Sequence, residues 1–310
     1  MKILCLVNPM SGNGAGRDIL CRLQRLYRPG VYDIVSEEMD PLRLDEQVQH
    51  LERYDFMLIG GGDGTISMLL PHIIDRPIRI GIIPLGTAND LAKEVGLYKL
   101  FDRHRLERWL EALAGMNTKP LSVWKLEWGE GKGALFCNYV SFGFDAAVVS
   151  EFSARRKMQA CSRFRGVWLN RFGYVAAGWR SFKSGFVESA VVRGSTNLVW
   201  RTGGSSIRSL LFSNIKSVMG LAVSNPNSNA FDGCIEAMSV GTLKDYITML
   251  ARHKLPLFGG EFIGSAAEWE ISGLDRGAKL QLDGEVYAGI WAPVFTIKKA
   301  GEITLAVASS

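Results

Sequence analysis

The sequence predicts an α/β fold built from two domains, a parallel-sheet domain followed by a mostly antiparallel β domain. Within the first 100 residues, short apolar strands alternate with helical segments, an order typical of a parallel sheet covered by helices. After about residue 119 the segments become short and alternating, with Gly, Ser or Asn between them. We therefore expect one domain over 1–119 and a second over 120–295.

The first domain should open with a buried strand over 2–8. A helix is expected over 14–27, because its apolar residues share one helical face, namely Ile19, Leu20, Leu23 and Leu26. The elements expected after these are, in order, strand 31–36, helix 40–51, strand 56–60, helix 66–74 and strand 78–84. In the helix over 40–51, aspartate would be the N-cap and proline would occupy the first turn. Pro71 is expected to end or kink the helix that contains it.

The second domain should consist of strands with period-two alternation and turn residues between them. The expected strand segments are 121–129, 133–144, 189–194, 197–203, 209–214, 234–241 and 278–285. Two helical interruptions are expected, at roughly 150–183 and at 243–254.

The composition predicts a reduced, cytoplasmic globular protein. The chain is 47% hydrophobic and 22% charged, which is ordinary for a soluble protein. The apolar run before Asn8-Pro9 is too short for a signal peptide, and no run is long enough to span a membrane. Five cysteines lack a CxxC pair, so free thiols are expected, and four histidines never fall at metal-ligand spacing.

Basic residues are concentrated in one part of the chain. Between Glu151 and Lys216 there are twelve Lys or Arg and two acids, a net charge of +10, which leaves −5 for the rest of the chain. Such a surface contacts phosphate-rich partners or is simply solvated. Arginines alternate with apolar residues at broadly helical spacing over 154–186, which favours contact with an anionic membrane, although these apolar residues can equally be core.

Three glycine-bearing loops follow three of the expected parallel strands, "NPMSGNGAGR", "GGGDGT" and "PLGTAND". Glycines let backbone N–H groups approach phosphate, and the helix N-termini that follow favour anions. The P-loop motif and the G-x-G-x-x-G spacing are both absent. Because the Asp63 carboxylate repels phosphate, it is expected to act through Mg²⁺ or its waters, with Thr65 binding oxygen.

These loops, together with "VSFGFDAAV", "NSNAFDG" and "QLDGE", resemble the diacylglycerol kinase catalytic family in its bacterial lipid-kinase branch, with sphingosine and ceramide kinases as relatives. The motifs occur in the family's order along essentially the whole chain. The resemblance implies a nucleotide domain similar to those of phosphofructokinase and NAD kinase, a β-sandwich-like domain, ATP and Mg²⁺ as cofactors, and a return of about 296–310 to the first domain.

The resemblance and the loops together indicate a set of nucleotide-contacting residues. They are Asn8, Ser11, Gly12, Gly14, Arg17, Ser36, Gly61, Gly62, Asp63, Gly64, Thr65 and Thr87. For Arg17 an ordinary solvated arginine is the alternative. Where the family usually continues its glycine motif with Asn and Glu, this chain has Ser67 and Met68.

The resemblance also implies the catalytic and metal residues. Glu285 is the candidate general base that deprotonates a lipid hydroxyl, and the alternative is an exposed glutamate after an Asp-Gly turn. Asp63 is a rival for the base, although we assign it to metal and nucleotide. Asp232 resembles a structural metal site completed by main-chain oxygens of Asn229 and Cys234. Asp90 either joins the magnesium network or caps the helix that follows it.

The sequence thus predicts an ATP-dependent kinase of a diacylglycerol-like or related lipid. It should be peripheral at the inner membrane face, with a lipid substrate at an anionic surface and no nucleic-acid partner. A homodimer stays open. Two alternatives also remain, a soluble kinase similar to NAD kinase and a nucleotide- or lipid-binding protein with impaired catalysis.

Overall fold

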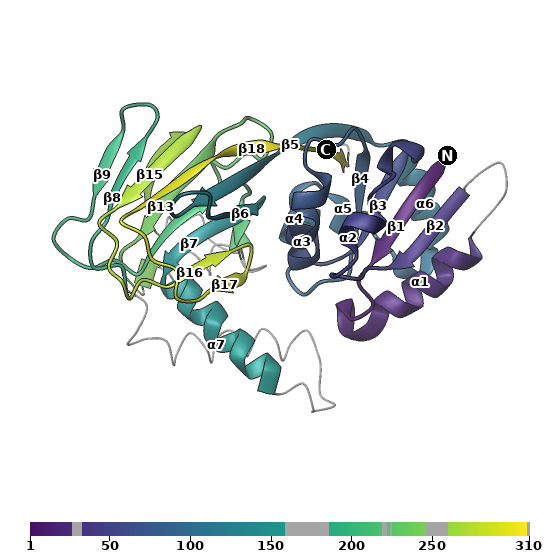
Figure 1. The fold of residues 1–310 in the computed structure, drawn as a ribbon, viewed down its shortest axis with the longest axis horizontal. Coiled ribbons are helices and arrows are strands. Elements are labelled where there is room, and N and C mark those ends of the chain that lie inside the picture. The colour runs from purple at the N-terminus through teal and green to yellow at the C-terminus, as the bar shows by residue number, and fades with distance from the viewer. Residues whose placement is uncertain are drawn as a thin grey trace. The chain divides into compact units, whose positions relative to one another are not determined.

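The computed structural model describes residues 1–26, 33–158, 186–218, 222–223, 225–242, 244–245 and 260–308, and for 152–158 and 222–223 it describes the backbone alone. The chain separates into two compact units (Figure 1). Unit 1 comprises Met1–Val123 and Gly301–Ser310, and unit 2 comprises Trp124–Ala300. Two long strands, β5 and β18, contribute residues to both units.

Unit 1 is organised around a parallel sheet in the order β2-β1-β3-β4, which the end of β18 extends in parallel. Its strands are β1 (Lys2–Val7), β2 (Asp33–Glu38), β3 (Phe56–Gly61), β4 (Arg79–Pro84), the start of β5 (Asn117–Glu127) and the end of β18 (Val294–Val307). All six residues of β3 are buried, as are the last five of β1. Burial on both faces is what a parallel sheet with helices on each side requires.

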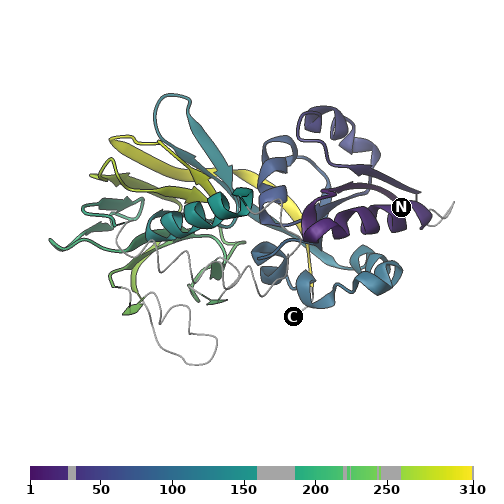
Figure 2. The ribbon, with the colours of Figure 1, turned by 90° about the horizontal axis from the view of Figure 1, so that it is seen from below.

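Helices flank both faces of this sheet (Figures 1 and 2). They are α1 (Ala15–Arg25), α2 (Leu44–Gln47), α3 (Asp63–Ile73), α4 (Asp90–Glu94), α5 (Leu97–Leu100) and α6 (Leu106–Ala114), with 3₁₀ turns η1 (Ser11–Gly14), η2 (Leu51–Arg53) and η3 (Arg103–Arg105). In α1 the buried residues include Ile19 and Leu23, so the predicted apolar face does pack on the sheet.

The expected helix over 40–51 is wrong, because only the single turn α2 and the 3₁₀ turn η2 form there. Local side chains compete for the backbone in this segment. The Asp40 carboxylate accepts the Leu42 N–H at 3.0 Å, and Gln47 Oε1 accepts the Asp40 N–H at 3.0 Å. Such bonds offer the chain an alternative to helix. Pro71 lies in the last turn of α3, which ends at Ile73.

Unit 2 is a sandwich of two antiparallel layers. One layer contains β5, β6, β8, β9, β15 and the start of β18, and the other has the order β14-β13-β10-β7-β16-β17. Aromatic pairs from the two layers meet between them, Phe142 with Phe295 at 5.1 Å and Phe212 with Trp269 at 5.7 Å between ring centroids. These rings belong to one buried cluster, so the core of unit 2 lies between the sheets.

The strands that begin in unit 2 are short, with the exception of β18. They are β6 (Gly133–Phe136), β7 (Tyr139–Gly143), β8 (Val191–Gly194), β9 (Val199–Arg201), β10 (Ser209–Ser213), β11 (Ser217–Val218), β12 (Ala222–Val223), β13 (Ile235–Val240), β14 (Glu261–Ala266), β15 (Glu268–Ser272), β16 (Leu280–Leu282), β17 (Glu285–Tyr287) and β18. The expected strand over 133–144 is broken after Phe136, and this break matters for the site below.

Helix α7 (Phe144–Met158) covers the outer face of the second layer, where Phe144 and Val148 pack with Leu211 and Met238. The helical interruption expected over 150–183 therefore starts earlier than predicted. Most of it, like most of the helix expected over 243–254, lies outside the described residues. Within the described part of the chain, no helix has the length and apolar character needed to cross a membrane.

Candidate active site

Three glycine loops of unit 1 meet at the edge where its parallel strands end. After β1 the turn η1 contains three successive residues with positive φ, Gly12 at 60°, Asn13 at 59° and Gly14 at 92°. This conformation turns consecutive N–H groups toward one side, as anion-binding loops do. A Cβ on Gly12 would lie 2.9 Å from the Leu85 carbonyl oxygen, so the loops after β1 and β4 are in contact.

The loops after β3 and β4 approach even more closely. A Cβ on Gly62 would lie 2.8 Å from the Gly86 Cα, which makes glycine necessary at this contact. Asn89 holds the third loop, the one after β4, because its side chain accepts the Gly86 N–H at 2.8 Å and donates to the Gly86 carbonyl at 2.7 Å. Asn8 joins the first and second loops by donating to Thr65 Oγ1 at 3.2 Å. The three loops thus form one backbone-lined surface.

Asp63 is the side chain that connects two of these loops. Its Oδ2 accepts the Asp90 N–H and its Oδ1 accepts the Leu91 N–H, each at 3.0 Å. Asp63 therefore caps helix α4, 27 residues further along the chain. Asp90 is the first residue of this helix, and its buried carboxylate lies 3.6 Å from Lys93 Nζ.

The other predicted residues of unit 1 lie on or near the same edge. Ser11 lies in η1, and Gly61 and Gly64 flank the Asp63 turn, with the Gly61 carbonyl accepting the Leu85 N–H at 2.9 Å. Thr87 is exposed in the third loop, Arg17 is exposed in the first turn of α1, and Ser36 is half-buried in β2.

The Ser67-Met68 pair, at which the chain departs from the family pattern, lies in the second turn of α3. Ser67 Oγ donates to the Asp63 carbonyl at 3.1 Å, and Met68 is exposed. Ser67 is thus bonded to the backbone of the glycine loop that follows β3.

Glu285 lies in unit 2, at the start of β17. It pairs with Leu282 across a two-residue turn in which Asp283 has φ 48° and Gly284 has φ 86°. Positive φ at both central positions is the type I′ geometry that Asp-Gly favours. Glu285 itself is exposed.

The turn that carries Glu285 is held by two side chains to which sequence reasoning assigned no role. The buried Asp283 carboxylate accepts backbone N–H groups from the break between β6 and β7. Gln281 Oε1 accepts the Gly284 N–H at 2.8 Å. The only local signal was the Asp-Gly pair, which predicts a turn but not its partners.

The predicted metal residues form an exposed turn in unit 2. Asp232 Oδ1 accepts the Cys234 N–H at 2.9 Å, and the Asp232 N–H approaches the Asn229 carbonyl at 3.4 Å. The oxygens in this turn suit a hard cation, although no cluster of three acidic, Cys or His side chains occurs among the described residues.

A buried carboxyl group lies near this turn. Glu236, in β13, is 2% exposed, receives a hydrogen bond from Ser265 Oγ at 3.0 Å, and has no hydrogen-bond partner for Oε2. Burial raises the pKa of Glu236 to about 7, and the nearby Asp232 charge contributes to the increase. Sequence analysis did not single out Glu236, because alternation alone placed it on one face of an ordinary strand.

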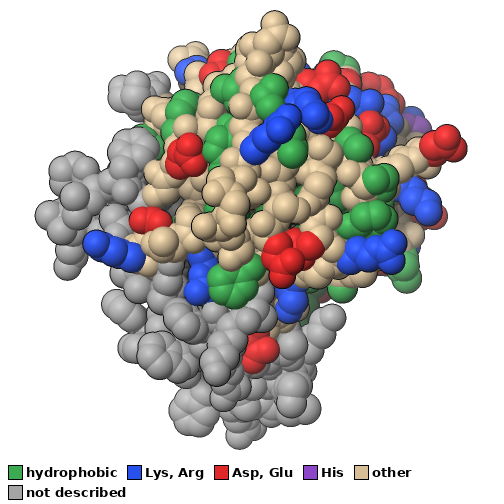
Figure 3. Space-filling model, turned by 90° about the vertical axis from the view of Figure 1, so that its left-hand side faces the viewer, with side chains coloured by type: hydrophobic (Ala, Val, Ile, Leu, Met, Phe, Trp, Pro, Cys, Tyr) green, Lys and Arg blue, Asp and Glu red, His purple; other side chains and the backbone are tan. Residues whose placement is uncertain are grey.

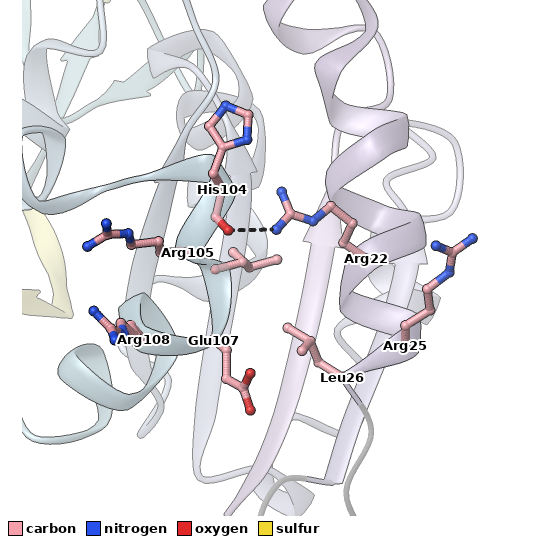
Figure 4. A pocket seen from close by; sticks show the side chains of 8 residues that line it. Arg22, Arg25, Leu26, His104, Arg105, Glu107 and Arg108 are labelled. Carbon is pink, nitrogen blue, oxygen red and sulfur yellow. Dashed lines mark hydrogen bonds between the residues drawn. The ribbon is translucent and has the colours of Figure 1, made fainter.

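A separate cavity of about 530 Å³ lies in unit 1 between the end of α1 and η3 with α6 (Figure 4). It is lined by Arg22, Arg25, Leu26, His104, Arg105, Leu106, Glu107 and Arg108. Arg22 donates to the carbonyls of Arg103 and His104, the latter at 3.3 Å, whereas Arg105 and Arg108 point away from α1. Because these cations do not converge and no glycine loop lines the cavity, we assign no role to it.

Comparisons with known proteins identify both parts of the chain. Residues 2–126 match the model of the diacylglycerol kinase catalytic domain, and residues 135–286 match the model of the diacylglycerol kinase accessory domain. Probable diacylglycerol kinase 3 of Caenorhabditis elegans is 29% identical over 201 residues, which cover 57% of this chain and 24% of that protein. Diacylglycerol kinase iota of Rattus norvegicus is 30% identical over 203 residues, covering 58% and 19% respectively. The matched region thus spans a quarter or less of these relatives.

Solved structures share the fold. A diacylglycerol kinase from Bacillus anthracis (strain Sterne) has a TM-score of 0.65 at 16% identity, covering 99% of this chain and 97% of that one. Yeast NADH kinase has a TM-score of 0.56 at 11% identity, covering 100% of this chain and 84% of that one. The predicted fold class, an α/β nucleotide-type domain plus an antiparallel β domain, is confirmed.

Proposed function

Since the chain belongs to the diacylglycerol kinase family, a family of lipid kinases, we propose that it transfers the γ-phosphate of ATP to a hydroxyl group of a diacylglycerol-like or related membrane lipid. The observation that carries this proposal is the succession of both family domains along one chain. The kinase family implies ATP as the donor. The accessory-domain match favours a lipid acceptor over the soluble nicotinamide substrate of the NADH kinase, which shares only the fold.

In unit 1 the backbone is expected to bind the phosphates. Gly12, Asn13 and Gly14 would present N–H groups at the N-terminus of α1. Thr65, which is buried and accepts a hydrogen bond from Asn8, would add a hydroxyl. Arg17 is well placed to add a positive charge to a phosphate. We place the remaining predicted contacts, including Ser36 and Thr87, around the same edge.

The residues present fit a magnesium ion as companion of the phosphates. Carboxylate oxygens carry more than one acceptor site, so Asp63 can hold a metal-bound water while it caps α4. Asp90 would add a second carboxylate, which is buried and lies 3.6 Å from Lys93 Nζ. Magnesium would supply neutralisation of the triphosphate charge. Asp63 would thus serve the donor site in two ways, by joining the loops and by attracting the metal.

In unit 2 Glu285 is proposed as the general base. Its exposure on a rigid turn leaves the carboxylate available to a substrate hydroxyl, whose proton it would take as the oxygen attacks phosphorus. Asp232 is proposed to bind a structural cation with the main-chain oxygens of Asn229 and Cys234. This second ion would stabilise the loop before β13 and take no part in transfer.

We further propose that the lipid is reached at the inner face of an anionic membrane. The basic excess of 151–216 supports this, but eight of its twelve Lys and Arg, those from 155 to 183, have side chains outside the described residues. The face that carries β8 and β9 shows both basic and acidic side chains (Figure 3). Arg193 of β8 pairs with Glu270 of β15 at 2.8 Å. We therefore assign membrane contact to the basic residues of the 155–183 segment. Whether the chain forms a homodimer is left open.

The test is to incubate the full chain with labelled ATP, Mg²⁺ and vesicles of mixed anionic and neutral lipids, and to identify the labelled lipid. Glu285→Gln keeps the size of the side chain but removes the proton acceptor, so kcat should fall by about 10²–10⁴-fold. ATP affinity should barely change. Glu270→Gln is the control, because it makes the same change at an exposed side chain of β15, a strand of the other layer of unit 2.

Absence of any labelled lipid in every vesicle mixture would favour the alternative of a nucleotide- or lipid-binding protein with impaired catalysis. Label on a soluble nicotinamide nucleotide would instead support the soluble kinase. If Glu285→Gln retained wild-type kcat, the base would have to be another residue.

A further inference from the structure

We propose that Asp283 is a positioning residue for Glu285, an inference that rests on the proposed function. Asp283 is 5% exposed although it occupies a turn, a place where aspartate is normally solvated. Its Oδ1 accepts the N–H groups of Asn138 at 2.9 Å and Tyr139 at 3.0 Å, and its Oδ2 accepts that of Cys137 at 3.0 Å. One carboxylate thus satisfies three consecutive amides.

The amides of Cys137 and Asn138 lie in the break between β6 and β7, which replaces the single strand expected from the sequence, and the Tyr139 amide is at the start of β7. A buried N–H group without a partner costs free energy, so the Asp283 carboxylate stabilises the backbone of the break. The same hydrogen bonds hold the turn that contains Asp283 against the break. The backbone strengthens the link, because the Asp283 N–H donates to the Tyr139 carbonyl at 2.9 Å. Asp283 is therefore fixed to β7 from both its side chain and its backbone.

Gln281 fixes the other end of the same turn. Its Oε1 accepts the Gly284 N–H at 2.8 Å, and its Nε2 donates to Ser141 Oγ of β7 at 2.8 Å. Gln281 and Ser141 are both fully buried. The side chains of Asp283 and Gln281 thus hold both central residues of the turn, Asp283 and Gly284, against β7. Glu285 is the next residue along the chain.

The turn contains only two residues, so Glu285 follows it with no intervening flexible position. Burial, and then the charges of Asp283 and Glu285, raise the pKa of Tyr287, which indicates that both carboxylates lie near the same ring. A catalytic base displaced by about 1 Å can lose on the order of 10² in rate. The function of the buried Asp283 is thus to hold the exposed Glu285 in place.

Asp283→Asn tests this with little change of shape. The amide Nδ2 cannot accept the Cys137 N–H, while Oδ1 still can accept the other two. We expect kcat to fall by roughly 10–100-fold, with KM for ATP unchanged. Hydrogen exchange of the 137–139 amides should become faster. In the double variant Asp283→Asn/Glu285→Gln, kcat should equal that of Glu285→Gln alone, because a residue that acts through Glu285 has nothing left to position.

Gln281→Met tests the same turn through another side chain if Asp283→Asn does not fold, and the same non-additive pattern is expected. A double variant slower than Glu285→Gln by the full Asp283→Asn factor would overturn the inference, as would faster exchange at 137–139 with wild-type kcat. Wild-type kcat in Glu285→Gln would contradict the proposed base itself and remove this inference with it.

Discussion

Replacing Asp63 should loosen helix α4 as well as reduce catalysis. The Asp63 carboxylate accepts two N–H groups at the start of α4, and that helix has only five residues with which to hold itself. Asp63→Asn leaves one acceptor oxygen, so one of the two bonds is lost and an N–H group remains without a partner.

The expected size follows from those bonds. A hydrogen bond to a charged acceptor contributes about 1.5–3 kcal/mol, and loss of a helix cap costs about 0.5–2 kcal/mol. We expect about 1–2 kcal/mol for Asp63→Asn and roughly 2–4 kcal/mol for Asp63→Ala in the free energy of opening α4. For Asn this corresponds to about 5–30-fold faster amide exchange at residues 90 and 91.

Hydrogen exchange followed by mass spectrometry over 88–96 measures this opening directly. Asp45→Asn is the matched control, because that side chain is 92% exposed and its contact is with His72. Nucleotide affinity and kcat should both decrease in Asp63→Asn, since this carboxylate joins the loops that we propose to bind phosphate. Unchanged exchange over 88–96 with a loss confined to kcat would refute the capping role and return the base assignment to Asp63.

Two further perturbations test other contacts. Gly62→Ala should weaken ATP binding more than tenfold, because the new Cβ would lie 2.8 Å from the Gly86 Cα, whereas Gly203→Ala, which meets nothing within 4 Å, should bind normally in the same titration. The pKa of Glu236 is raised from 4.5 to about 7, so between these pH values the folded state keeps a proton that the unfolded state releases. The free energy of unfolding should therefore decrease by roughly 3 kcal/mol as the pH rises from about 4.5 to about 7. Glu236→Gln should lack this decrease. The thermal midpoint of the variant should therefore rise relative to that of the wild type between pH 5 and pH 8. A difference between the two midpoints that does not change with pH would count against a buried, protonated Glu236.

The sequence by itself determined the features that depend on neighbouring residues. Apolar runs predicted the four N-terminal strands, and the alternation of strands with helical segments predicted that these strands are parallel. Both signals can be found in short stretches of the sequence. The Asp283-Gly284 pair predicted the tight turn before Glu285, since few residues accept positive φ. The helix over 40–51 failed for an equally local reason, the bonds of Asp40 and Gln47 to the backbone, which propensity does not weigh.

Only the tertiary structure decided what the polar side chains of the site contact. Asp63 binds amides 27 and 28 residues away, and Asp283 binds amides 144 to 146 residues away. These pairings depend on which strands lie side by side, so no window of the sequence contains both partners. From the sequence alone, an aspartate in a glycine loop can be a metal ligand or a helix cap, because a carboxylate can serve both roles. The capping role of Asp63 became visible only when the sheet order placed α4 beside it.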